Sequence, residues 1–245
     1  MPILGVLLLV IQVLFAAHAV NTGRDRFWIY IIIFIPGIGC LVYFMTQVLP
    51  EIGQNRAVIR TRNSLIKSLD PQRELRRRRE ELEISDNIDN RLQLADECVE
   101  ARLYEDAVSL YESCLRGIQE NDPDIMLRIA QAHFSANEFQ KAKDTLDSLK
   151  RLNPDYRSHD GHLLYARTLE SLKLNQEAVR EYEILANSYP GEEARVRFGL
   201  LLQSLGEHDR AREMFQQTLL RVKHAPKYYR QKEKHWTNIA RTELN

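Results

Sequence analysis

The hydrophobic positions of this chain follow two different patterns. Residues 3–20 form an apolar run that is interrupted only by Gln12 and His18, and residues 27–49 form a second apolar run of 23 residues without a charge. From residue 88 onward, apolar residues instead recur at helical spacing between charged residues. The first pattern predicts two apolar helices, and the second predicts amphipathic helices that bury one face.

The amphipathic region has an internal period. Four alanines mark it at intervals of 35, 36 and 33 residues: Ala107, Ala142, Ala178 and Ala211. A large apolar residue follows each of them at the fourth position: Tyr111, Leu146, Tyr182 and Phe215. Residues four apart lie on one face of a helix, and a period of about 20–50 residues is typical of stacked helical units. The sequence predicts an all-α solenoid of about four helix pairs, over residues 88–121, 123–156, 159–191 and 192–225.

This region resembles the tetratricopeptide repeat family. The family pattern combines W-x2-L-G-x2-Y on a first helix, A-x3-F on a second helix and a closing proline. The matching residues are Phe198, Gly199, Leu202, Ala211 and Phe215 in the fourth copy, with Pro154 and Pro190 closing the second and third. The resemblance implies that small residues at the eighth and twentieth positions lie where the two helices of a pair cross. It also implies that the first helices line a concave groove that binds a protein partner.

The same resemblance supplies a candidate partner-binding groove. The family's groove positions correspond here to Leu92, Asp96, Glu100, Leu127, Gln131, Phe134, Leu163, Arg167, Glu170 and Leu200. We expect an acidic groove with an apolar stripe at the fifth positions, which are Leu92, Leu127, Leu163 and Val196. Acidic residues in the first turn of each first helix complement the helix dipole. Asp96, Glu100 and Glu170 lie beyond the first turn and indicate a basic segment of a partner.

The two apolar runs near the amino terminus are each long enough to span a hydrocarbon core of about 30 Å. Only six residues, 21–26, join them, so we expect a tight transmembrane hairpin over residues 1–50. Basic residues follow the second run at Arg56, Arg60, Arg62 and Lys67. The positive-inside rule then places both chain termini in the cytoplasm, as expected for an integral protein of a bacterial inner membrane.

A cleaved signal peptide is the alternative interpretation of the first run. Ala17-His18-Ala19 has the small-x-small form of a cleavage site. A signal peptide carries a basic residue ahead of its apolar stretch, and here no Lys or Arg precedes the run. The second apolar run follows directly, so the hairpin is favoured.

Trp28, Pro36, Gly39 and Tyr43 resemble the membrane hairpin at the amino terminus of bacterial cardiolipin synthases and other phospholipase D relatives. Pro36, Gly39 and Tyr43 lie at i, i+3 and i+7, where a kink and a small residue are expected to let the neighbouring span come close. The resemblance implies contact with the lipid bilayer. The catalytic part of that family needs paired H-x-K-x4-D motifs, and none of the seven histidines here is followed two residues later by lysine. Phosphatidyl transfer is therefore excluded.

Two further segments complete the predicted organisation. Residues 51–87 form a basic and charged helical linker, which either lies on the inner leaflet or is a solvated connector. Its run Arg76–Arg79 is followed by glutamates at helical spacing, which predicts a solvated helix with internal ion pairs and no nucleic-acid binding. Residues 226–245 are expected to form one capping helix, with Trp236 as its packing anchor.

Chemistry-bearing motifs are missing from the sequence. The net charge is zero, and the three cysteines, Cys40, Cys98 and Cys114, lack metal-ligand spacing. No G-x-S-x-G, Walker, G-x-G-x-x-G or H-E-x-x-H motif occurs, so we expect no enzyme, no cofactor, no metal and no small-molecule substrate. The sequence predicts a membrane-anchored scaffold or adaptor. The alternatives are an accessory subunit of a phospholipid enzyme of the cardiolipin type, and an envelope assembly factor.

Overall fold

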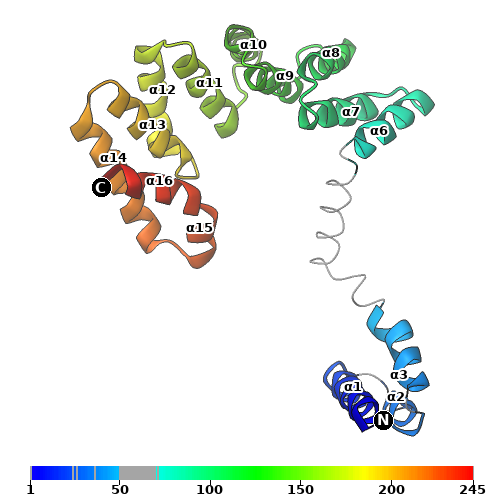
Figure 1. The fold of residues 1–245 in the computed structure, drawn as a ribbon. Coiled ribbons are helices and arrows are strands. Elements are labelled where there is room, and N and C mark those ends of the chain that lie inside the picture. Colours follow the sequence, from blue (N-terminus) through cyan, green and yellow to red (C-terminus); the bar gives the residue numbers. More distant parts are fainter. Residues whose placement is uncertain are drawn as a thin grey trace. The chain divides into compact units, whose positions relative to one another are not determined.

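The computed structural model of the chain describes residues 2–23, 25, 27–35, 37–49, 70 and 72–244, with side chains from residue 8 onward. The chain divides into two compact units, Met1–Arg73 and Glu74–Asn245 (Figure 1). Every secondary-structure element within the described residues is a helix. The predicted all-α class is therefore confirmed.

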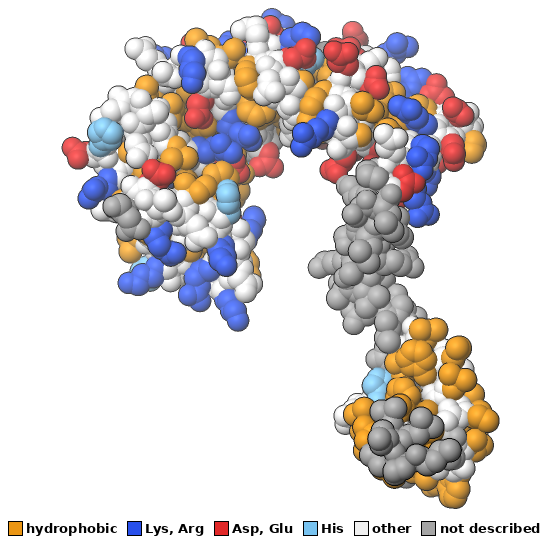
Figure 2. Space-filling model, in the orientation of Figure 1, with side chains coloured by type: hydrophobic (Ala, Val, Ile, Leu, Met, Phe, Trp, Pro, Cys, Tyr) orange, Lys and Arg blue, Asp and Glu red, His pale blue; other side chains and the backbone are white. Residues whose placement is uncertain are grey.

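The first unit is a small helical hairpin. Helix α1 (Pro2–Asn21) packs against α2 (Phe27–Phe34) and α3 (Ile38–Tyr43), and a π-helical turn, η1 (Phe44–Val48), follows. Its core consists of four buried residues, Ala19, Ile32, Cys40 and Tyr43. Large apolar side chains remain exposed around this core, and Figure 2 shows them over the visible face of the unit.

The polar residues of the first apolar run bond to the second arm of the hairpin. Gln12 donates from Nε2 to the carbonyl oxygen of Ile32 at 2.8 Å, and His18 Nδ1 lies 3.0 Å from the Tyr43 hydroxyl. The rings of Trp28 and Tyr43 are 5.5 Å apart between centroids. Tyr43 therefore lies in the core of the hairpin, and its partners explain why two polar residues interrupt α1.

The second arm of the hairpin is broken between Phe34 and Ile38. Gly37 has a φ of 84° in this break, while Pro36, where the kink is predicted, lies outside the described residues. A Cβ at Gly39 would come within 2.3 Å of the Ile31 carbonyl oxygen. The closest approach at Gly39 is therefore to α2 within the same arm, and the predicted approach of the neighbouring span stays a prediction.

The described residues contain no helix that is both long enough and apolar enough to cross a membrane. The basic connector residues Arg56, Arg60, Arg62 and Lys67 lie outside the described residues.

The end of the predicted linker belongs to the repeat unit. Helix α6 (Arg73–Ile84) buries Leu75 in the core of the first helix pair, and Asn90 donates from Nδ2 to the carbonyl oxygens of Glu81 and Ser85 at 3.2 and 2.8 Å. The predicted pair Arg77–Glu81 forms at 3.5 Å. The linker boundary at residue 87 is wrong, because one apolar face of α6 packs on the first pair and makes it an amino-terminal cap.

Four helix pairs follow, each within one of the predicted repeats. They are α7 (Ile88–Glu100) with α8 (Tyr104–Cys114), α9 (Pro123–Ser135) with α10 (Phe139–Leu152), α11 (His159–Ser171) with α12 (Asn175–Ser188), and α13 (Glu193–Ser204) with α14 (His208–His224). A 3-10 turn, η2 (Gly117–Gln119), connects the first two pairs. Side chains of Asn87, Asp122 and Ser158 cap the first helices of three pairs, as expected for short polar residues.

The helices of each pair cross at small residues. At most 2% of the surface of the repeat alanines is exposed, and a Cβ at Gly199 would lie 2.6 Å from the Phe215 ring. The buried alanines are Ala95, Ala107, Ala130, Ala142, Ala166, Ala178 and Ala211. The prediction of small residues at the eighth and twentieth positions is confirmed.

The carboxyl-terminal cap consists of two helices. Helix α15 (Lys227–Lys232) ends at Glu233, and α16 (Lys234–Leu244) packs on α13 and α14. Trp236 packs against the last core, as predicted, and the Arg197 guanidinium lies 5.0 Å from its ring centroid. The prediction of one continuous helix is wrong, because the two helices are separated at Glu233. The buried Glu233 side chain accepts a hydrogen bond from the backbone N–H of Glu192 at 2.9 Å.

Candidate protein-binding site

The predicted apolar stripe lies mostly in the core. Leu127, Leu163 and Val196 are at most 9% exposed, while Leu92 and Leu200 are half-buried against the cores. The first helices α9, α11 and α13 pack both on their own partner helix and on the preceding pair, so their fifth positions face inward. The stripe therefore stabilises the solenoid and offers little surface to a partner.

The acidic residues of the predicted groove bond to tyrosines of the second helices. Asp96 accepts a hydrogen bond from the Tyr111 hydroxyl at 2.6 Å, and Glu170 accepts one from Tyr182 at 2.7 Å. Burial, together with the adjacent carboxylates, raises the pKa of both tyrosines. These bonds hold the two helices of a pair together, whereas Glu100 is exposed near the end of α7.

Arginines accompany these acids on the first helices. Arg128 pairs with Asp96 at 2.7 Å, and Arg197 pairs with Glu193 at 2.7 Å. The Arg167 guanidinium lies 4.7 Å from the centroid of the Phe134 ring, and burial lowers its pKa. The acidic groove therefore stays a prediction, although Asp96 pairs with Arg128 within the protein and three arginines share these helices. Gln131 is exposed.

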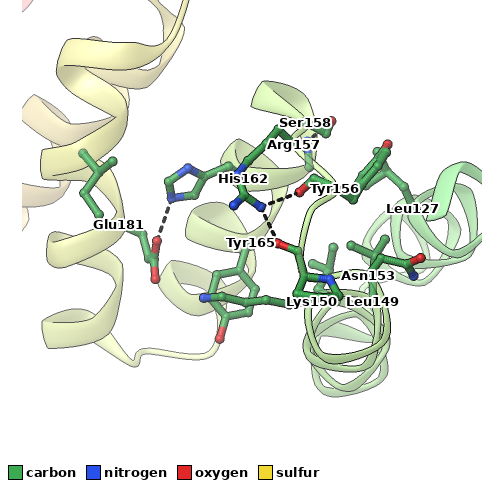
Figure 3. Close-up of a pocket in the computed structure, with 14 residues that line it drawn as sticks. Leu127, Leu149, Lys150, Asn153, Tyr156, Arg157, Ser158, His162, Tyr165 and Glu181 are labelled. Carbon is green, nitrogen blue, oxygen red and sulfur yellow. Dashed lines mark hydrogen bonds and ion pairs between the residues drawn. The ribbon is translucent and has the colours of Figure 1, made fainter.

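A cavity of 370 Å³ opens between the second and third helix pairs (Figure 3). Its apolar lining includes Leu127, Leu146 and Leu149 of the second pair, and Ile184 of α12, which is 57% exposed. Of the predicted groove residues, only Leu127 lines this cavity.

The chain forms this cavity where α10 ends. Pro154 follows the helix, and two hydrogen bonds fix the loop that leads to α11. Asn153 Nδ2 donates to the carbonyl oxygen of Asn121 at 3.1 Å, and the Tyr156 hydroxyl donates to the carboxylate of Asp124 at 2.7 Å. Gly161 in the first turn of α11 carries no side chain, and a Cβ there would lie 3.3 Å from Leu127 Cδ1. The space beside the loop therefore stays open.

Charged side chains surround the apolar lining. The Lys150 ammonium lies 5.5 Å from the centroid of the Tyr165 ring, and Arg157 donates to the carbonyl oxygens of Pro154 and Tyr156 at 2.6 and 3.1 Å. His162 Nε2 is 2.6 Å from a carboxylate oxygen of Glu181, and this hydrogen bond lowers the pKa of Glu181. Among the described residues that line the cavity, Glu181 is the one carboxylate. Glu181 bonds to His162, and the exposed Lys150 and Arg157 also line the cavity.

Sequence reasoning missed this cavity, although one signal was present. Ile184 lies between the core residues Tyr182 and Leu185 in the sequence but is not part of the repeat pattern. The sequence therefore contains a large apolar residue that the pattern leaves on the exposed face of α12. The depth of the cavity depends on how two pairs stack, which the repeat period does not specify.

The cysteines and the histidine that could have suggested chemistry are buried packing residues where the structure describes them. Cys98 and Cys114 are 1% exposed in the first core, and burial raises the pKa of both thiols. His133 is buried and its Nδ1 lies 2.7 Å from Glu138. In the part of the chain that the structure describes, no group of three or more His, Cys, Asp or Glu residues could hold a metal ion.

Comparisons with known proteins agree with this architecture. A tetratricopeptide repeat family model matches residues 99–167, which run from the end of α7 into α11. The observed helix pairs agree with this match over the matched residues. No curated protein matches the chain.

Solved structures of other proteins have a similar fold. A crystal structure of MamA is 22% identical, with a TM-score of 0.51, over 59% of this chain and 84% of that one. MamA from Desulfovibrio magneticus RS-1 is 13% identical, with a TM-score of 0.55, over 66% and 93% of the two chains. TTC0263, a thermophilic repeat protein of Thermus thermophilus, is 16% identical, with a TM-score of 0.53, over 69% and 88%. These similarities concern the repeats and give no support to the cardiolipin synthase resemblance of residues 3–49.

Proposed function

We propose that this protein is a non-enzymatic scaffold whose repeats bind a segment of another protein. The observation that carries this proposal is the apolar cavity between the second and third helix pairs, which is open to solvent beside the exposed Ile184. Its 370 Å³ can accept one or two large side chains. A buried anchor of this kind supplies much of the affinity of a protein interface.

The charges at the rim define the chemistry of the partner. Lys150 and Arg157 are exposed and line the cavity. A segment that inserts an apolar side chain and carries Asp or Glu beside it would satisfy both features. Ser158, the serine of the lining that could suggest catalysis, already accepts the Gly161 N–H as a helix cap at 3.0 Å.

Site-specific photo-crosslinking in cells tests this proposal. A photoreactive residue at position 184 should capture one specific protein, and the capture should be lost when Lys150→Glu and Arg157→Glu are introduced together. The same residue at position 118 is the matched control, because Ile118 is 99% exposed but lies in η2, away from the cavity. Equal capture at both positions, or capture at 184 that survives the charge reversal, would refute the proposed site.

We also propose that the hairpin unit anchors the protein in a bacterial inner membrane, with both termini in the cytoplasm. Two features support the membrane contact. Large apolar side chains such as Leu9, Leu14 and Phe34 are more than half exposed, and Gln12 and His18 each form a hydrogen bond inside the hairpin. Apolar surface of this extent is unfavourable in water and is favoured in contact with lipid.

A further inference from the structure

The basic residues of the repeat unit are concentrated at its carboxyl-terminal end. Residues 88–220 contain 16 Lys and Arg against 24 Asp and Glu, whereas residues 221–235 contain six against one. The single acid of this segment, Glu233, is buried and accepts the Glu192 N–H. Figure 2 shows the resulting group of Lys and Arg side chains around the end of α14 and α15. The unit therefore has opposite charge on its repeats and on its cap.

The basic side chains of residues 221–235 are mostly exposed to solvent. Five side chains are exposed, and none forms an ion pair with another described residue: Lys223, Lys227, Arg230, Lys232 and Lys234. Two large side chains on the same segment are also exposed, Tyr228 at 72% and Leu220 at 59%. Basic residues interspersed with an exposed aromatic and an exposed aliphatic side chain are typical of surfaces that lie at the headgroup level of a bilayer.

We propose that the basic cap, formed by Leu220, Lys223, Lys227, Tyr228, Arg230 and Lys232, docks on the anionic phospholipid headgroups of a membrane. Its positive charge is attracted to the leaflet, while the acidic repeats are repelled, so the solenoid would meet the surface by its carboxyl-terminal end. The proposal rests on the membrane placement of the hairpin in one respect: a tether at the other end of the chain would raise the effective concentration of lipid at the cap.

The size of the effect follows from the number of charges. Each Lys or Arg near an anionic leaflet improves binding about fivefold. Replacing three of them, as Lys223→Gln, Lys227→Gln and Arg230→Gln, should therefore weaken binding by roughly a hundredfold at low salt. Salt should have the same effect on the unmodified protein, because exposed charges are screened over about 8 Å at physiological ionic strength.

Vesicle sedimentation of residues 74–245 tests the proposal. This unit contains three hydrophobic cores of its own, so it can be studied without the hairpin. It should sediment with vesicles that contain phosphatidylglycerol and stay in solution with phosphatidylcholine vesicles. The triple variant should lose the binding.

A second triple variant, Arg151→Gln, Lys173→Gln and Arg212→Gln, is the control, because it removes three exposed charges outside the cap. Equal binding by both triple variants, sedimentation independent of phosphatidylglycerol, or tighter binding of RNA than of the anionic vesicles would overturn the proposal. Residues 74–245 do not contain the hairpin, so these results say nothing about whether the hairpin inserts into a membrane. Carbonate extraction of the full chain tests that insertion separately.

Discussion

Single residues with left-handed backbone form each turn between the two helices of a pair. Arg102, Asn137, Lys173 and Gly206 occupy the same position of the four copies and have φ values of 61°, 62°, 62° and 83°. At the third turn, the N–H groups of Lys173 and Leu174 donate to the carbonyl oxygens of Glu170 and Leu169, both at 3.0 Å, which closes α11. Only Gly206 has the residue type that adopts this conformation without a steric cost.

Replacing Lys173 by glycine should therefore stabilise the repeats. A non-glycine residue in this region costs about 1–2 kcal/mol, part of which is offset by the greater chain entropy of glycine in the unfolded state. We expect the free energy of unfolding of residues 74–245 to rise by about 0.5–1 kcal/mol in urea titrations. Arg180→Gly, in the exposed interior of α12, should instead lower it by about 1 kcal/mol. Destabilisation by both changes would show that position 173 carries no backbone strain.

At the scale of elements, the sequence period predicted the four pairs and their crossings, because Ala107, Ala142, Ala178 and Ala211 must be small for geometric reasons. Features without a period were missed. Leu75 is buried in the first core, but the arginines next to it in the sequence make α6 look polar throughout. Glu233 is compatible with an amphipathic helix in the sequence, although the structure buries it between α15 and α16. Acidic Glu192 matches the dipole of α13 at its amino terminus, and nothing in the local sequence indicates that it is fully buried.

A buried polar cluster joins the last helix pair to the cap. The Glu192 carboxylate, 0% exposed, pairs with the buried Arg195 and lies 3.3 Å from Arg221, and it accepts the Tyr229 hydroxyl at 2.9 Å. Arg195 also donates to the Ala186 carbonyl oxygen. Burial, and then the Glu192 carboxylate, raises the pKa of Tyr229 to about 12. Because Tyr229 belongs to α15, Glu192 has this hydrogen bond only when α15 is docked.

Removing one charge of this cluster should destabilise the repeat unit strongly. Glu192→Gln leaves Arg195 buried without a counter-charge, and breaking such a pair costs about 3–5 kcal/mol. Urea unfolding of residues 74–245 should show this loss. The neighbouring Glu193→Gln, whose partner Arg197 is partly solvated, should cost less than about 1 kcal/mol. Similar losses from both variants would mean that the buried pair does not hold the cap.

At the scale of the whole molecule, composition and hydropathy separated an apolar amino-terminal unit from a charged repeat unit, and the two compact units agree with that division. The partner-binding surface was harder to predict. Several groove positions carried over from the repeat family are core residues, such as Leu163, or internal acceptors, such as Asp96, whereas Gln131 and Glu100 are exposed. The open cavity arises instead from the stacking of two pairs, which depends on Gly161 and on the loop after α10.

The orientation of the anchor can be tested with the full chain. Arg56, Arg60, Arg62 and Lys67 follow the second apolar run, so a reporter that is active only outside the cytoplasm should be silent when fused after Asn245. The same reporter fused within residues 21–26 should be active. Activity at the carboxyl terminus would reverse the proposed topology and support an assembly factor on the outer side of the membrane.

The most direct test of the account is the affinity of the repeat unit for the partner segment captured by crosslinking at position 184. Calorimetric titration of that segment, as a synthetic peptide, into residues 74–245 should give a Kd that rises at least about tenfold for Ile184→Ser, a loss of about 1.4 kcal/mol. Ile118→Ser, the control on η2, should leave the Kd unchanged. An unchanged Kd for Ile184→Ser, or equal weakening by both variants, would contradict the claim that the protein binds its partner in the cavity between the second and third helix pairs.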